Sequence, residues 1–201
     1  MVPVNSEQCY LTDDILEILM DGDADGLARY LAAGGDANAA HNGNPLLTWA
    51  CSLALDHPQM VKLLVEHGAD VNRRGHKGEI PIVTTSYLGA ASTVALLLGA
   101  GARVNDADDD IGQTALMAAA KGGHLDGVER LVAHGGKVDA KDKRGSTALH
   151  WSATEGDHPD VVRYLLKVGL DPDEKNASGR SPKDYARSLN RHRMLKVMEQ
   201  A

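Results

Sequence analysis

The chain has 201 residues, 43% of them apolar and 24% charged, which are the proportions of a globular protein rather than a disordered one. The net charge of −7 disfavours non-specific binding to nucleic acid, because such binding needs a basic surface. Two cysteines are too few for a disulfide framework, and the first ten residues have neither the basic nor the apolar part of a signal peptide. No stretch is long and apolar enough to span a bilayer, so we expect a cytoplasmic protein without a membrane segment.

The predicted elements are short helices that follow one another in pairs along the whole chain. We expect these pairs near residues 11–33, 45–67, 79–100, 112–134, 146–168 and 181–200. A glycine ends the second helix of the first five pairs, at intervals of 33 or 34 residues: Gly34, Gly68, Gly101, Gly135 and Gly169. Glycine adopts the left-handed conformation at the end of a helix at little cost. A single pair cannot bury its apolar face alone, whereas stacked pairs can, so the period predicts a solenoid.

Side chains at fixed places in each unit have an expected local role. Thr114 and Thr147 begin first helices, where a hydroxyl can accept a hydrogen bond from a free backbone N–H. Pro58 and Pro159 each follow a histidine, and proline suits the first turn of the second helix.

The first-helix blocks QTALMAAA and STALHWSA, and the segments AAGGDANA and EHGADVNR around the repeated glycine, resemble the ankyrin repeat family. That family has the pattern G-x-T-P-L-H-x-A-A, then a glycine turn, then a leucine-rich helix that ends in GADVN. The resemblance covers nearly the whole chain. It implies an all-α ankyrin-repeat solenoid of stacked helix-turn-helix units, about six units including both caps.

We expect a single domain, in which residues 1–10 form an N-terminal extension and residues 11–40 an N-terminal capping repeat. Residues 41–173 would form four central repeats and residues 174–201 a C-terminal capping repeat.

Only the segment from Thr147 to His150 keeps the threonine and the histidine of the family pattern together. In the other central units the histidine is replaced by Thr48, Val83 or Met117, so we expect those units to lack the buried Thr–His hydrogen bond.

The resemblance also implies where a partner would bind, since partners of this family usually meet the loop tips and the exposed face of the first helices. Carried over position by position, the expected partner-binding residues are Lys77, Glu79, Tyr87, Leu88, Ile111, Gln113, Lys121, Lys143, Arg144, Thr154 and Glu155. Tyr87, Leu88 and Ile111 stand out, because apolar groups near basic ones resemble an interface core with a polar rim. The alternative is that Leu88 and Ile111 simply pack adjacent units together.

No catalytic residues, cofactor or metal site are expected. The acidic run at residues 21–26 resembles the start of a calcium loop, but Ala32 stands where that loop needs a glutamate. The nine histidines have no zinc-site spacing. The sequence therefore favours a monomeric scaffold, adaptor or inhibitor that binds a protein partner of unknown identity.

Two functional alternatives stay open: an enzyme or metal-dependent protein with a site grafted on the repeats, and nucleic-acid binding through the C-terminal cap. That cap, residues 174–201, holds seven basic residues against three acidic ones.

The acidic loop 106–110 could receive a basic partner, although a solvated loop is the plainer interpretation. Trp49 and Trp151 occupy equivalent places, where packing is a simpler role than ligand contact.

Overall fold

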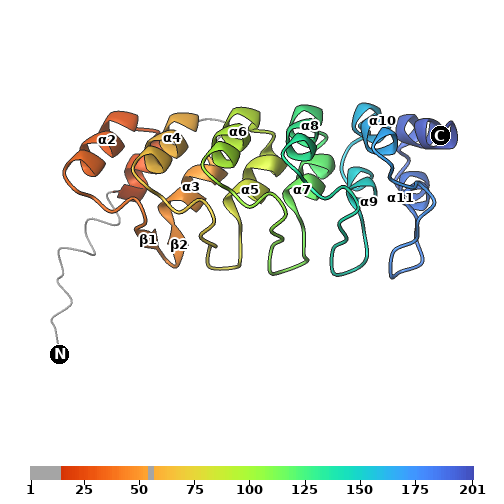
Figure 1. The fold of residues 1–201 in the computed structure, drawn as a ribbon, viewed down its shortest axis with the longest axis horizontal. Helices are drawn as coiled ribbons and strands as arrows, with labels where there is room; N and C mark the ends of the chain where they lie inside the picture. Colours follow the sequence, from red (N-terminus) through yellow and green to blue (C-terminus); the bar gives the residue numbers. More distant parts are fainter. Residues whose placement is uncertain (1–14, 54–56) are drawn as a thin grey trace.

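The computed structural model describes residues 15–53 and 57–201, so the expected extension at 1–10 and the start of the first capping repeat lie outside the described residues. Within them, helices stack in chain order as antiparallel pairs (Figure 1). The pairs are the helical segment 15–21 with α2 (Ala24–Ala32), α3 (Leu46–Ser52) with α4 (Pro58–Glu66), α5 (Pro81–Leu88) with α6 (Ala91–Gly99), α7 (Ala115–Gly122) with α8 (Leu125–Ala133), α9 (Ala148–Ser152) with α10 (Pro159–Lys167), and α11 (Pro182–Ser188) with α12 (His192–Glu199). The predicted all-α solenoid is confirmed.

Strand content in the described part of the chain is limited to β1 (Ala40–His41) and β2 (Asn44–Pro45), which pair antiparallel in the loop before α3. In Figure 1 the second helices α4, α6, α8 and α10 form one layer and the first helices α3, α5, α7 and α9 form the other. The connecting loops between units project together beyond the first-helix layer. Among these helices none is long and apolar enough to cross a membrane.

The core is a row of aliphatic side chains between the two layers, and it contains no phenylalanine because the chain has none. Val128 and Leu131 of α8 are completely buried, and so are Ala118, Ala119 and Ala120 of α7. Alanine on this face lets the neighbouring first helices approach closely, so thin layers can fill the interior without bulky rings.

The glycine that ends each second helix has the predicted left-handed backbone. The φ angles of Gly34, Gly68, Gly101, Gly135 and Gly169 are 90°, 84°, 90°, 84° and 104°. A side chain would fit in the surrounding space at each of these positions, so the backbone conformation alone selects glycine.

Asparagine side chains at equivalent positions form hydrogen bonds between consecutive units, next to these glycines. The Asn72 amide donates to the carbonyl of Gly101 over 3.1 Å and accepts from the N–H of Arg103 over 2.8 Å. Asn38 and Asn105 make the same pair of bonds to the units that follow them. In the next unit Asp139 takes the place of the asparagine, and an ionised carboxylate cannot donate the first of these bonds.

The buried Thr–His pair forms in the fifth unit, as its sequence predicts. The backbone N–H of Thr147 donates to Nδ1 of His150 over 3.1 Å, and Nε2 of His150 lies 3.2 Å from the carbonyl of Arg180. Nδ1 must therefore be unprotonated and Nε2 must carry the proton, so the native ring is neutral. In the fourth unit the Thr114 hydroxyl accepts from the N–H of Met117 over 3.4 Å, as expected of a helix cap.

A charged His150 would lose the bond at Nδ1, and burial lowers its pKa although the Arg180 carbonyl opposes that shift. Because the folded pKa lies below the unfolded value of about 6.5, the stabilisation by neutral His150 is complete above that pH and is lost as pH falls below it. We expect the free energy of unfolding of the wild type to fall toward that of His150→Gln between pH 7.5 and pH 5. Urea denaturation of both proteins at the two pH values checks this, and a difference that stays constant would contradict it.

Because the core of each unit packs against the units beside it, a destabilising substitution in the middle of the array and one at its end have different consequences. Leu131→Ala opens a cavity between neighbouring units, and we expect it to lower the free energy of unfolding by about 2–5 kcal/mol. Met198→Ala, in the equally buried core of α12, should instead let α11 and α12 exchange amide hydrogens faster while the central units keep their protection. Hydrogen exchange that accelerates uniformly along the chain would contradict this.

Candidate protein-binding face

Four side chains from three consecutive units meet on the first-helix layer, and we call them the Tyr–Lys cluster: Tyr87, Lys121, Trp151 and Glu155. The Tyr87 hydroxyl donates to the Glu155 carboxylate over 2.9 Å, although 68 residues separate the two. The Lys121 ammonium lies 3.0 Å from the other oxygen of the same carboxylate. It also lies 4.8 Å from the centre of the Tyr87 ring and 5.5 Å from the Trp151 ring, within cation–π range of both.

The cluster fixes the charge of its members. Burial disfavours the Glu155 anion, but hydrogen bonds from Lys121 and Tyr87 outweigh this and lower the pKa of Glu155. The hydrogen bond to Glu155 in turn raises the pKa of Tyr87, so the phenol stays protonated. With a neutral phenol, a carboxylate and an ammonium held together, this face offers a partner both aromatic surface and paired charges.

Neighbouring groups hold the cluster in place. The Trp151 indole N–H donates to the carboxylate of Asp142 over 3.0 Å. Nε2 of His124, in the turn before α8, lies 2.9 Å from the carbonyl of Tyr87. The bond to Asp142 fixes the Trp151 side chain, and the bond to His124 holds the backbone at Tyr87, which keeps 39% of its surface accessible.

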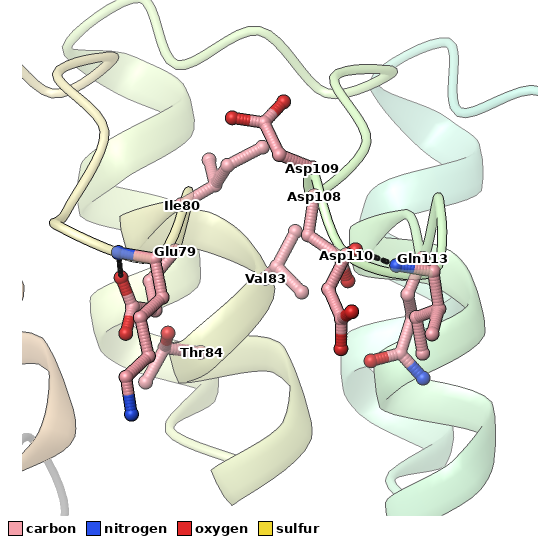
Figure 2. A pocket seen from close by; sticks show the side chains of 10 residues that line it. Glu79, Ile80, Val83, Thr84, Asp108, Asp109, Asp110 and Gln113 are labelled. Atoms are coloured by element: carbon pink, nitrogen blue, oxygen red, sulfur yellow. Dashed lines mark hydrogen bonds between the residues drawn. The ribbon is translucent and has the colours of Figure 1, made fainter.

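A groove adjoins the cluster on the side of the N-terminal units, and we call it the acidic groove. Its larger part has a volume of about 630 Å³ between α5 and the loop 106–113, and a smaller part of about 220 Å³ lies between α3 and α5. Glu79 and Thr84 line both parts, so the two parts adjoin each other at these side chains. Figure 2 shows Glu79 and Thr84 on one side of the larger part, Asp110 and Gln113 on the other, and Val83 between them.

The residues expected to bind a partner divide among these places. Lys77, Glu79, Ile111 and Gln113 line the acidic groove, and Tyr87, Lys121 and Glu155 form the Tyr–Lys cluster. Arg144 and Thr154 line a pocket of about 190 Å³ beside Trp151. Leu88 is half-buried, and the Lys143 ammonium donates to the backbone carbonyls of Asp109 and Asp110.

Three parts of this surface were not expected from the sequence. Trp151 packs against the hydrophobic core, as expected of it, and its ring also faces Lys121 in the cluster. Asp142 holds its indole, and the nine-residue spacing between the two was the available signal. The acidic loop 106–110 forms a wall of the groove rather than an isolated solvated loop.

The acidic run at 21–26, which resembles the start of a calcium loop, contributes a helix cap. Oδ1 of Asp23 accepts from the N–H of Gly26 over 2.8 Å and so caps α2. Among residues 15–53 and 57–201, no group of three or more His, Cys, Asp or Glu side chains is arranged to hold a metal ion.

Comparison with known proteins agrees with the repeat geometry. The family profile described as "Ankyrin repeats (3 copies)" matches residues 82–176, and the profile "Ankyrin repeat" matches residues 42–76. The mouse B-cell lymphoma 3 protein homolog is 31% identical over 145 residues, which are 69% of this chain and 32% of that protein. The human protein phosphatase 1 regulatory subunit 27 is 38% identical over 73 residues, 36% of this chain and 47% of that protein.

An enzyme is also among the relatives. The intracellular phospholipase A2 of Caenorhabditis elegans is 34% identical over 103 residues, 48% of this chain but only 10% of that protein. The chain thus spans less than half the length of each of these three relatives.

The Tyr87–Glu155 hydrogen bond can be tested by titration. Tyr87→Phe removes one of the donors that lower the pKa of Glu155, so the Glu155 carboxyl should titrate at a higher pH than in the wild type. NMR titration of the Glu155 side-chain carbon measures the shift. Tyr164→Phe, on α10, is the matched control and should leave the Glu155 titration unchanged. An unchanged titration in Tyr87→Phe would show that the bond does not form in solution.

Proposed function

This chain belongs to the ankyrin repeat family, whose repeats generally mediate protein–protein interaction, and we propose that it binds a protein partner without catalysing a reaction. The binding face would be the first-helix layer with its loop tips, and the protein would act as a monomer. The Tyr–Lys cluster is the observation that carries the proposal. It places a tyrosine and a tryptophan, residue types that dominate interface energies, around one lysine ammonium in the middle of the array.

The relatives support a regulatory or adaptor role. One of them is named a regulatory subunit of a phosphatase, and its matching part is 36% of this chain. The match to the phospholipase covers a tenth of that enzyme, so it supports shared repeats rather than shared chemistry.

We place this binding activity in the cytoplasm, because Cys51 is a buried free thiol and disulfide-free proteins are typical of reducing compartments.

Tyr87→Ala should weaken the binding of a partner by at least about 2 kcal/mol, roughly thirtyfold. The substitution removes a central aromatic anchor, and Lys121 and Glu155 both lose their contact with the Tyr87 side chain. The partner is first captured from a native lysate with the full chain as bait. The affinities of wild type and variant are then compared by calorimetry at fixed salt.

Two further variants locate the binding face. Lys121→Ala should act mainly on the association rate and its salt dependence, as expected of a charge at the rim. Lys62→Ala, on α4 in the opposite layer, removes an exposed lysine that pairs with Glu66 and should leave the affinity unchanged. If Lys62→Ala weakens binding while Tyr87→Ala does not, the proposed face is wrong.

A further inference from the structure

We propose that the acidic groove holds an extended segment of the partner that carries a lysine or arginine side chain. This inference rests on the proposed function and specifies which part of the face recognises which chemistry. Three independent features of the groove support it: unpaired buried polar atoms, an internal comparison between repeats, and the charges of the groove walls.

The unpaired atoms point to a ligand with main-chain hydrogen-bonding groups. Among the described residues, four buried side-chain polar atoms have no hydrogen-bond partner: Thr48 Oγ1, Trp49 Nε1, Ser86 Oγ and Gln113 Nε2. All but the Ser86 atom belong to residues that line the acidic groove. Thr48 is only 7% exposed and Gln113 only 9%. A buried donor or acceptor that is left without a hydrogen-bond partner destabilises the folded chain.

The fifth unit shows how the fold normally satisfies these positions. There the Trp151 indole donates to Asp142, nine residues earlier, and His150 fills the site that Thr48 occupies in the second unit. Nine residues before Trp49 stands Ala40, which has no carboxylate to offer. The indole N–H of Trp49 is therefore an unused donor beside the groove, as is the amide N–H of Gln113 at its other end. Carbonyl oxygens along an extended peptide are acceptors that could meet both.

The carboxylates of the groove select a basic side chain. Asp109 pairs with Arg74 over 3.2 Å, and Oδ1 of Asp108 accepts two backbone N–H bonds within its own loop. The carboxylate of Asp110 has no partner among the described residues. One carboxylate oxygen of Glu79 accepts a hydrogen bond from the backbone N–H of Lys77.

These two carboxylates stand across the groove from each other in Figure 2. The groove floor includes Ile80 and Val83, which suit the aliphatic stem of lysine or arginine, while Asp110 and Glu79 suit its charged end. The larger part of the groove has four carboxylates and a single ammonium in its lining, so an acidic segment would be repelled.

A phage-displayed library of random twelve-residue peptides, selected on the full chain, tests the ligand chemistry directly. We expect the selected peptides to share a lysine or arginine at one position, and synthetic copies with glutamate there to lose binding. Asp110→Asn combined with Glu79→Gln should weaken the selected peptides about tenfold and reduce the salt dependence of binding. Glu129→Gln, an exposed carboxylate on α8, is the matched control and should have no effect.

Gln113→Met separates a role of Gln113 in peptide binding from a merely structural role. The substitution keeps the shape and removes the unpaired amide, so the free protein should melt at a higher temperature while the selected peptides bind more weakly. Selection of acidic peptides, no selection at all, or peptides that ignore the double variant would each overturn the inference. If that happens while the native partner still responds to Tyr87→Ala, only the groove assignment fails. If the native partner responds to Lys62→Ala and not to Tyr87→Ala, the proposed function fails.

Discussion

Each helix pair in this protein buries its apolar face only against the pairs beside it, and every other feature of the structure depends on that constraint. Val128 and Leu131 of α8 are completely buried although α8 is only nine residues long, because α7 of the same unit and the helices α6 and α10 of the neighbouring units pack against α8. A short helix is marginal by itself in water, so the stability of each unit comes from its two interfaces. The repeat must therefore keep its spacing wherever its surface residues change.

The same constraint makes the proposed binding face a property of several units. Tyr87 reaches past the fourth unit to Glu155 of the fifth, with Lys121 between them. His124 at the start of the next second helix is placed to bond the Tyr87 carbonyl. A change in the stacking of one unit would therefore move side chains that no single unit positions, which couples recognition to the register of the whole array.

The fold could be predicted from the sequence because glycine, threonine and proline act locally. Positive φ at Gly68 or Gly135 and the proline at the first turn of α4 follow from the residue type itself. The surface positions could be predicted from the repeat register, but their pairings could not. The contact of Tyr87 with Glu155 depends on side-chain direction across two interfaces, and the role of Trp151 depends on Asp142 from a preceding loop.

Two of the departures from the repeat pattern, Thr48 and Val83, line the acidic groove, which is consistent with the proposed role of the groove in recognition. Where the pattern residues are kept, as at Thr147 and His150, the buried polar groups satisfy one another. Where they are replaced, as at Thr48 and Val83, the groove lies open and polar atoms remain unpaired. Such atoms weaken the free protein, and departures of this kind from local stability are found typically at functional sites. A ligand that lacks the matching groups leaves them buried and unmet, so each unpaired atom discriminates against wrong partners more strongly than it attracts the right one.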